Sequence, residues 1–272
     1  MKKIIILDIP FDAVDEYQAL SRVMAFIKNE DGKSKMVATP NPEMLLAARR
    51  NTQFREILNR TDLNIADGTG ILWAATYLNK IKNVKSRALK IFIGITELIL
   101  MTFNPSRSQK ILPQRVTGTD MVELICKNID DKYPVFLLGG ADDTAKKTAA
   151  LLNKKYSTRI AGTNNGSADA SHDEEIVKHI NACSPAILFV AFGAPKQELW
   201  LERNLGKLTT VKVAMGVGGA FDFISGNIKR APLLMRKLGL EWLYRLLKQP
   251  SRIKRIINAT VIFPIKVIKS SL

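Results

Sequence analysis

The sequence has few of the residues that build metal centres. Its 272 residues include two cysteines, Cys126 and Cys183, and two histidines. This shortage argues against a structural zinc site. The cysteines are far apart and their neighbours are typical of helices or strands, so we expect two buried thiols in a reducing compartment.

Two further motifs are absent. The chain contains no Asp-x-Asp sequence and no His, Cys and carboxylate residues at the spacing of metal ligands. The sequence therefore does not support metal-assisted phosphate chemistry. A diphosphate leaving group would need arginines or lysines to offset its charge.

No apolar run is long enough to cross a bilayer. Residues 88–103 are mostly apolar over 16 positions and residues 256–265 over ten, whereas a span needs about 20. Both segments predict an interfacial or buried helix. The apolar run 4–7 ends at Asp8 and Pro10, so we expect no secretory signal.

Acidic residues are scarce in two segments. Residues 229–272 contain eleven Lys or Arg and one acid, Glu241, and residues 80–115 contain eight and one acid, Glu97. Together they account for essentially all of the net charge of +16. Both segments are also apolar, which is typical of contact with an anionic membrane surface and not of nucleic-acid binding. The alternative is a solvated helix with a charged outer face.

Short β-branched runs alternate with helical patterns, which predicts an α/β fold with a mostly parallel sheet. The predicted strands are 3–7, 36–39, 63–66, 135–138, 159–162, 186–191 and 211–215, and the predicted helices lie near 15–28, 42–59, 69–79, 119–129, 143–155, 172–182 and 196–204. We expect one domain over residues 1–228 and a basic, amphipathic, membrane-associating appendage over 229–272.

Polar or glycine-rich loops follow nearly every predicted strand. In open α/β sheets, ligands bind outside the carboxyl ends of the strands. Glycines let backbone N–H groups approach phosphate oxygens, and helix N-termini add partial positive charge. These loops are 39–42, 67–70, 139–142, 162–166, 193–198 and 216–219. Each loop alone is weak evidence for a ligand site, because turns between strands and helices need glycine for steric reasons too. Together the loops predict a sugar-nucleotide site.

Several side chains in these loops have two interpretations. Asp67 is a general base at the mouth of the sheet or the N-cap of the helix that begins near Thr69. Thr39 and Asn41 follow the preceding strand and could face Asp67, although Asn41 before a proline is also an ordinary turn residue. Gln197 and Glu198 open a helix, where an acid is favoured in any case.

The C-terminal segment offers cations for a leaving group. On one continuous helix, Arg245, Arg252 and Arg255 would lie within about 80° of one another. Pro250 interrupts that helix, and contact with lipid headgroups alone is the alternative.

Six motifs, in order, resemble the WecG/TagA/CpsF glycosyltransferase family over roughly residues 5–256. They are Thr-Pro-Asn-Pro-Glu at 39–43, Ala-Asp-Gly-Thr-Gly at 66–70, Arg-Val-Thr-Gly-Thr-Asp at 115–120, Phe-Gly-Ala-Pro-Lys-Gln-Glu at 192–198, Gly-Val-Gly-Gly-Ala-Phe-Asp at 216–222 and Gly-Leu-Glu-Trp-Leu-Tyr-Arg-Leu at 239–246.

The resemblance implies a Rossmann-like fold of the GT-E type and an inverting transferase that needs no metal or other cofactor. Such an enzyme moves N-acetylmannosamine from UDP to polyprenyl-diphosphate-linked N-acetylglucosamine, in making wall teichoic acid or another surface polysaccharide. It implies a cytoplasmic protein, peripheral on the inner face of the bacterial cell membrane. A UDP-glucose or UDP-N-acetylmannosaminuronic acid donor, or a non-catalytic nucleotide-binding protein at the membrane, are the alternatives.

The resemblance also assigns roles to residues. Asp67 matches the general base, with Thr39 beside it, and the arginines match those that the family's C-terminal appendage contributes to catalysis. The expected substrate-binding residues are Asn41, Gly139, Gly140, Gln197, Gly218, Gly219 and Asp222.

The chain departs from the family pattern in one place. Residues 80–109 are about 30 extra residues, where family members usually have a short loop. This is the second basic and apolar segment. We expect it to form an amphipathic element on the membrane near the acceptor entrance, with a helical hairpin for self-association into a homo-oligomer as the alternative.

Overall fold

The chain folds around a six-stranded sheet in which every strand pair is parallel. The computed structural model describes residues 2–29, 32–104, 110–232, 235, 244, 246, 247, 250 and 253–272. The strand order is β4-β3-β8-β7-β5-β6. The strands are β3 (Lys35–Ala38), β4 (Leu63–Asn64), β5 (Val135–Gly139), β6 (Ile160–Asn164), β7 (Ile187–Ala191) and β8 (Val213–Gly216). The predicted Rossmann-like α/β fold is confirmed.

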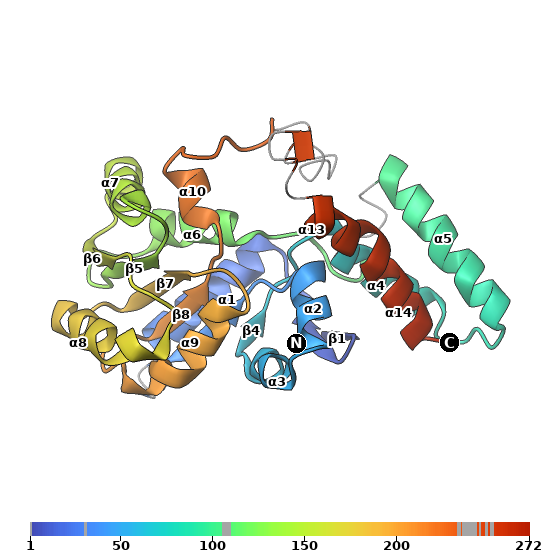
Figure 1. Ribbon diagram of the computed structural model, residues 1–272, viewed down its shortest axis with the longest axis horizontal. Helices are drawn as coiled ribbons and strands as arrows, with labels where there is room; N and C mark the ends of the chain where they lie inside the picture. Colours follow the sequence, from blue (N-terminus) through green and yellow to red (C-terminus); the bar gives the residue numbers. More distant parts are fainter. Residues whose placement is uncertain are drawn as a thin grey trace.

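Helices cover both faces of this sheet (Figure 1). On one face lie α1 (Glu16–Lys28), α6 (Gly118–Asn128), α7 (Thr144–Tyr156) and α10 (Ala220–Ile224). On the other lie α3 (Thr52–Arg60), α8 (Asp173–Cys183) and α9 (Lys196–Asn204), with the short 3-10 turns η2 (Ala170–His172) and η3 (Leu205–Lys207) beside them. The helices that precede a strand return the chain to the start of that parallel strand, as crossover connections require, whereas α10 follows the last strand, β8.

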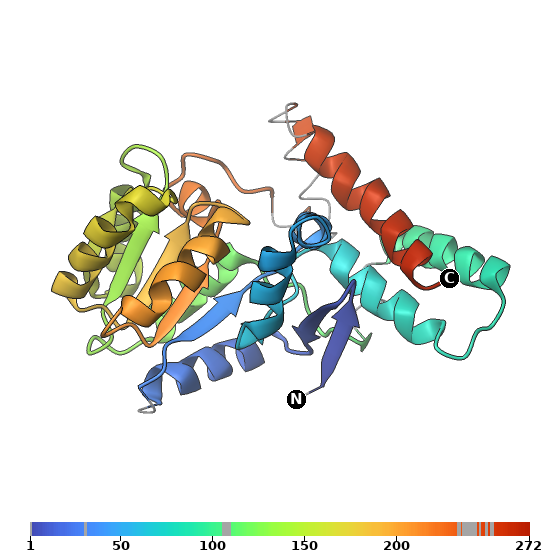
Figure 2. The ribbon, with the colours of Figure 1, turned by 60° about the horizontal axis from the view of Figure 1, so that its bottom comes forward.

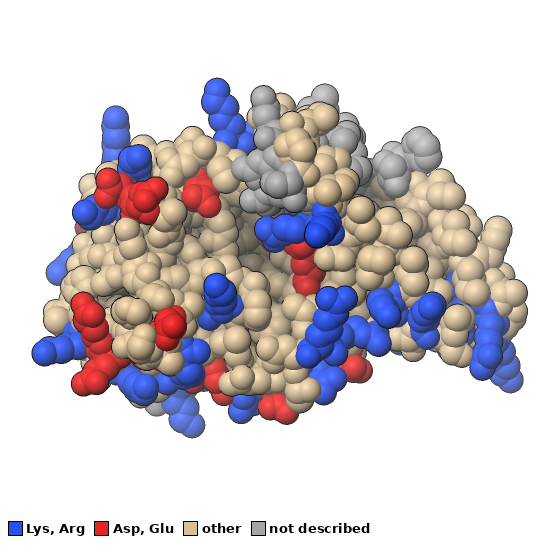
Figure 3. Space-filling view, viewed as in Figure 1, with Lys and Arg blue, Asp and Glu red and all other residues tan. Residues whose placement is uncertain are grey.

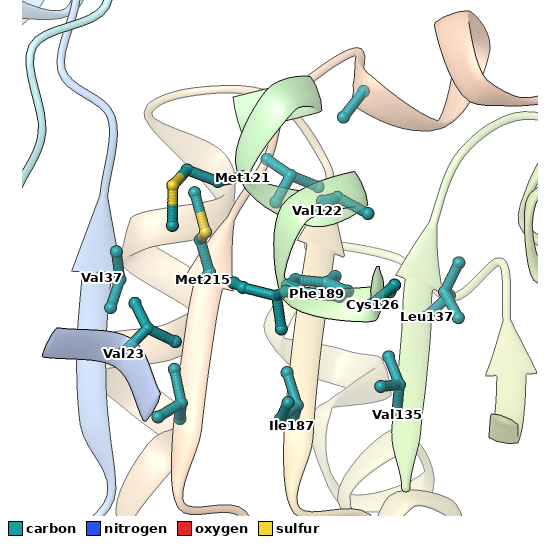
Figure 4. Packing of buried hydrophobic residues seen from close by; sticks show 14 of the residues in the cluster. Val23, Val37, Met121, Val122, Cys126, Val135, Leu137, Ile187, Phe189 and Met215 are labelled. Atoms are coloured by element: carbon teal, nitrogen blue, oxygen red, sulfur yellow. The ribbon is translucent and has the colours of Figure 1, made fainter. Parts of the chain in front are cut away.

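Successive side chains of a strand point to opposite faces of the sheet, so the apolar core is divided between the two faces. Val135 and Leu137 pack under α6 and α7, whereas Phe136 and Leu138 pack against the opposite face. Figure 4 shows the first of these clusters, in which side chains of β3, β5, β7 and β8 meet helical side chains such as Cys126. Strands buried on both faces need continuous apolar runs, which explains why the sequence made them easy to predict.

A third apolar cluster lies at the end of the molecule away from α7 and α8 (Figures 1 and 2). It joins a two-stranded hairpin, β1 (Lys3–Ile6) and β2 (Ile9–Asp12), to α2 (Pro42–Ala48), α4 (Thr69–Lys80) and α5 (Arg87–Phe103). The C-terminal helical segment, composed of α13 (Ile253–Ile257), a π-helical turn η5 (Asn258–Ile262) and α14 (Phe263–Ser270), packs on the same cluster. Phe263 and Val267 are fully buried there.

The first strand is paired differently from the prediction. Residues 3–6 form an antiparallel hairpin with β2 and do not join the parallel sheet. The turn between them has positive φ at Leu7 and Asp8, 47° and 66°, a conformation usually signalled by Asn-Gly or Asp-Gly. Because Leu-Asp is not such a signal, and because β2 contains Pro10, the hairpin was not apparent from the sequence.

The predicted helix over 42–59 is two helices. Asn51 caps the second one, its side-chain oxygen accepting a hydrogen bond from the Phe54 amide at 3.0 Å. Of the two cysteines, Cys126 is buried, as expected, and burial raises the pKa of its thiol to about 12. Cys183 is only partly buried, so the prediction for it was wrong.

The two segments that were predicted to form helices too short to span a membrane are helical in the described residues. Residues 88–103 lie in α5, and residues 256–265 run through α13, η5 and α14. No helix in the described parts of the chain combines the length and the apolar character that crossing a membrane requires. The domain boundary at residue 228 stays a prediction.

Candidate active site

A polar cleft of about 270 Å³ lies at the carboxyl ends of β3, β4, β7 and β8. Its lining comes from the loops after these strands, from the first turns of α2, α6 and α9, from α10 and the segment after it, and from α13. The lining includes eight of the predicted site residues, Thr39, Asn41, Asp67, Gln197, Gly218, Gly219, Asp222 and Arg255. The sheet thus brings together residues that are up to 216 positions apart, as expected for the carboxyl edge of an α/β sheet.

Asp67 lies in the loop between β4 and α4 and lines the cleft. Its backbone N–H donates to the carbonyl of Pro40 at 3.2 Å, which ties the loop after β4 to the loop after β3. The N-cap position of α4 belongs to Gly68, where the described residues contain no side-chain cap hydrogen bond. The capping interpretation of Asp67 is therefore not supported, and its role as a base stays a prediction.

Asn41 combines the two roles that its sequence allows. Its side-chain oxygen accepts a hydrogen bond from the Met44 amide at 3.0 Å and caps α2, and the same residue lines the cleft. Since the cap uses the amide oxygen, the amide NH₂ is the group with which Asn41 could contact a substrate. Thr39, which is buried, lines the cleft beside it.

Gln197 bridges two loops of the cleft with its side-chain oxygen. This oxygen accepts hydrogen bonds from the backbone N–H of Gly193, after β7, at 3.1 Å and from that of Gly218, after β8, at 2.9 Å. The Gly218 N–H is thus used within the protein. The amide nitrogen of Gln197 donates to Glu198 Oε1 at 2.7 Å. Gln197 therefore holds the shape of the cleft in addition to lining it.

Glu198 is a fully buried carboxyl group directly behind Gln197. Burial raises its pKa to about 7, against the lowering effect of hydrogen bonds from Gln197 and from the backbone. An acid in the first turn of a helix is usually solvated, and its pKa is then not raised by burial. Glu198 differs from such acids in both respects.

The N-terminus of α6 forms another wall of the cleft. Thr117 caps this helix, its hydroxyl oxygen accepting from the Asp120 amide at 3.2 Å, and Thr117, Gly118 and Thr119 line the cleft. Arg230 donates to Asp120 Oδ1 at 2.8 Å. Burial opposes ionisation of Asp120, but the hydrogen bonds from Arg230 and Thr117 outweigh it and lower the pKa. A helix N-terminus directed at a cleft suits an anionic ligand.

Arg255 reaches the cleft from α13 and is held by Glu43 of α2. Its Nε donates to Glu43 Oε1 at 3.1 Å and to Oε2 at 2.9 Å, and its Nη2 donates to Oε2 at 2.7 Å, so the pair is bidentate. The carboxylate raises the pKa of the guanidinium. Within the part of the chain that the structure describes, these bonds to Glu43 do not involve Nη1.

Of the other four predicted site residues, the structure describes only Gly139 and Gly140. Gly139 and Gly140 are not among the lining residues. Gly139 has φ of 99°, and a Cβ there would lie 2.8 Å from the carbonyl carbon of Ala191, so close packing of β5 against β7 accounts for the glycine. Arg245 and Arg252 lie outside the described residues.

Other lining residues were not assigned a role from the sequence. They are Glu43, Met44, Thr117, Gly118, Thr119, Gly193, Ala194, Val217, Ala220, Phe223 and Ile228. Most belong to the six motifs or adjoin them, so motif membership was the available signal. Ile228 lies outside all six motifs, so motif membership could not identify it.

The fold and the cleft together are typical of α/β proteins that bind ligands at the carboxyl edge of a Rossmann-like sheet, and this edge carries helix N-termini, glycines and a guanidinium. The chain belongs to the glycosyl transferase WecG/TagA/CpsF family, whose model matches residues 4–98 and 98–272. The two matched segments meet within α5, the helix of the inserted basic and apolar segment.

Membership of this family makes the protein a glycosyltransferase of surface polysaccharide synthesis. The family implies, in general, a sugar-nucleotide donor and a lipid-linked acceptor. The particular sugar, donor and acceptor are matters of proposal.

Proposed function

We propose that the protein transfers N-acetylmannosamine, or a closely related sugar, from UDP to polyprenyl-diphosphate-linked N-acetylglucosamine with inversion. The pathway would be that of wall teichoic acid or another surface polysaccharide. The observation that carries this proposal is the position of Asp67 in one cleft with Thr39, Asn41 and Arg255. A carboxylate and a guanidinium are the groups that an inverting transfer without a metal needs.

In the proposed reaction, Asp67 accepts the proton of the acceptor hydroxyl as that oxygen attacks the anomeric carbon of the donor. A new glycosidic C–O bond forms while the C–O bond to UDP breaks, and UDP leaves with the electron pair. The guanidinium of Arg255 would offset the charge that develops on the diphosphate, together with Arg245 and Arg252. The absence of any Asp-x-Asp sequence supports a reaction that needs no metal.

The proposal is tested with a panel of UDP-sugars and a polyprenyl-diphosphate N-acetylglucosamine acceptor. We expect UDP release with one donor, unchanged by EDTA, and a loss of about 10²- to 10⁴-fold in kcat for Asp67→Asn, the usual cost of removing a general base. Donor binding should persist in this variant. UDP binding by the wild type without turnover of any donor would favour a nucleotide-binding protein, and near-normal turnover by Asp67→Asn would contradict the base assignment.

We also propose that the protein works at an anionic membrane surface. The side of α5 that faces away from the core exposes Leu89, Phe92, Ile95 and Ile99. These positions share one face of a helix. The opposite face packs inward, where the Lys90 Nζ donates to the carbonyl oxygen of Ser271 at 2.6 Å. Half-exposed apolar side chains in such a row are typical of an interfacial helix.

The C-terminal helical segment presents a second row. Ile253, Ile257, Val261 and Ile265 follow at four-residue spacing and are all exposed. Helix α14 contacts α5, and both lie at the same end of the molecule (Figures 1 and 2). In Figure 3, Lys and Arg side chains border this end, while much of its surface carries no charge. Apolar rows bordered by cations suit acyl chains and anionic headgroups.

A further inference from the structure

The buried Glu198 is not explained by helix formation. An acid in the first turn of α9 would interact with the helix dipole equally well at the surface. Instead, Glu198 is 0% exposed, and its Oε2 atom has no hydrogen-bond partner among the described residues. Burying a carboxyl group with an unpaired oxygen costs stability, which points to a role that requires the group.

The nearest contact of Glu198 is the side-chain amide of Gln197. This amide has two distinguishable ends, and only one orientation fits its surroundings. Its oxygen faces two N–H donors, those of Gly193 and Gly218, and its nitrogen faces Glu198 Oε1. Rotation by 180° would place the NH₂ group against two N–H groups and the oxygen against a carboxyl oxygen. An acceptor at position 198 therefore selects the orientation in which the two loops are joined.

Gly216, at the end of β8, lies close to this pair. A Cβ atom on Gly216 would lie 2.5 Å from Gln197 Nε2 and 2.8 Å from Glu198 Oε1. Real Cβ atoms essentially never show contacts this short, so a side chain at position 216 would displace the pair. The position of Gln197 is thus restricted by packing on one side and by three hydrogen bonds on the others.

We propose that Glu198 is a positioning residue, which orients the Gln197 amide and thereby holds the Gly193 and Gly218 loops together around the donor site. Glu198 itself does not line the cleft, whereas Gln197, Gly193 and Gly218 do. This proposal rests on the proposed function for the identity of the donor, a UDP-sugar. The bridge itself is a property of the folded chain.

The test compares Glu198→Met, which keeps the approximate volume but removes the acceptor, with Glu198→Gln, which keeps an acceptor oxygen. In Glu198→Met we expect amide hydrogen exchange of Gly193 and Gly218 to accelerate by about tenfold or more, since both N–H groups lose an oriented acceptor. We expect the KM for the UDP-sugar to rise about tenfold with a smaller change in kcat. Glu198→Gln should restore both quantities to within about threefold of the wild type.

Unchanged exchange at both glycines together with an unchanged donor KM in a folded Glu198→Met variant would overturn the proposal. If that variant does not fold, Glu198→Asp replaces it, because a shortened side chain withdraws the oxygen from Gln197 while keeping the carboxylate. Wild-type exchange and KM values for Glu198→Asp would overturn the proposal equally. Hydrogen exchange requires no substrate, so it decides the matter even if the wild type turns over no UDP-sugar, an outcome that would contradict only the proposed function.

Discussion

Glu198 couples the stability of the protein to pH. Burial raises its pKa from 4.5 to about 7, and no charged group contributes to that shift among the described residues. A carboxyl with a raised folded-state pKa binds more protons when folded than when unfolded, so its ionisation destabilises the fold as pH rises from about 4.5 through about 7. Each pKa unit corresponds to about 1.4 kcal/mol.

We therefore expect Glu198→Gln, which cannot ionise, to gain stability over the wild type as pH increases. The difference in unfolding free energy between the two should shift in favour of the variant by about 3 kcal/mol between pH 4.5 and pH 8. Urea unfolding at a series of pH values measures this. A difference that is constant across the series would show that Glu198 titrates normally.

Individual site residues differ in how far the sequence could predict them. Asp67 and Asn41 follow predicted strands directly, so their place at the carboxyl edge followed from the α/β pattern. Glu198 occupies a position where an acid is ordinary, and only its burial distinguishes it. Gly139 was grouped with ligand loops, but its close approach to Ala191 shows why a glycine in such a turn is ambiguous.

At the scale of elements, the Arg255–Glu43 pair connects α13 to α2 at the cleft. Arg255 is largely exposed, so the pair contributes little to stability. Its geometry matters more, because a bidentate partner reduces the freedom of the guanidinium before a diphosphate binds. We expect Glu43→Gln to raise the donor KM by about three- to tenfold while the unfolding free energy changes by less than about 1 kcal/mol.

Glu202→Gln is the matched control for this prediction. Glu202 accepts from Arg60 Nη2 at 2.7 Å in another exposed pair, between α9 and α3 and outside the cleft lining. Steady-state kinetics and chemical unfolding of both variants are required. A lower donor KM in Glu43→Gln would mean that Glu43 competes with the donor for Arg255, contrary to the prediction.

The exposed row on α5 gives a prediction about membrane contact. Replacing Phe92, Ile95 and Ile99 by serine removes half-exposed apolar surface without disturbing the buried face of the helix. We expect binding to vesicles of phosphatidylglycerol and phosphatidylcholine to weaken by about tenfold or more. Cosedimentation measures this, and turnover with a lipid-linked acceptor should fall in parallel.

Leu151→Ser on α7 serves as the control, since this leucine is also exposed but lies at the other end of the molecule. It should leave vesicle binding unchanged. Light scattering distinguishes the alternative: a triple variant that binds vesicles normally but loses a homo-oligomer would show that α5 mediates self-association.

Helices and strands were predicted correctly where the local sequence pattern agrees with the burial of the segment in the fold. The strands β3, β5, β7 and β8 are largely apolar and buried on both faces, whereas the edge strand β6 is only partly buried; all six strands were predicted within a few residues. The β1–β2 hairpin was missed because its turn has positive φ at residues without the usual signal. The helix over 42–59 was predicted as continuous because the polar break at Asn51 also fits a solvated helix face.

At the scale of the whole molecule, the cleft is built from distant segments whose proximity could not be predicted from the sequence. Glu43 and Arg255 are 212 residues apart, and no local pattern links them. The motif order indicated that the residues belonged to one site, but only the pairing of α13 with α2 through Arg255 and Glu43 shows that Arg255 reaches it. Basic composition indicated a surface role for the C-terminal segment and did not reveal its buried face.

That buried face makes the end of the chain part of the core. Phe263 and Val267 are 0% exposed, and their helix, α14, packs against α2, α4 and α5, whereas Ile265, two positions after Phe263, is 43% exposed. Truncating a fully buried phenylalanine to alanine costs about 3–5 kcal/mol, because it removes apolar contacts and leaves a cavity. A change at an exposed isoleucine usually stays within about 0.5 kcal/mol.

We therefore expect Phe263→Ala to lower the unfolding free energy of the whole chain by about 3–5 kcal/mol and Ile265→Ala by about 0.5 kcal/mol. Both variants remove an apolar side chain of the same helix, so membrane affinity should fall more for Ile265→Ala, whose side chain faces outward. Urea unfolding followed by tryptophan fluorescence is suitable, since Trp73 of α4 belongs to the same cluster. Equal, small effects of the two substitutions would mean that the C-terminal segment is a detachable appendage, because a helix that merely rests on the surface contributes nothing to the cooperative core.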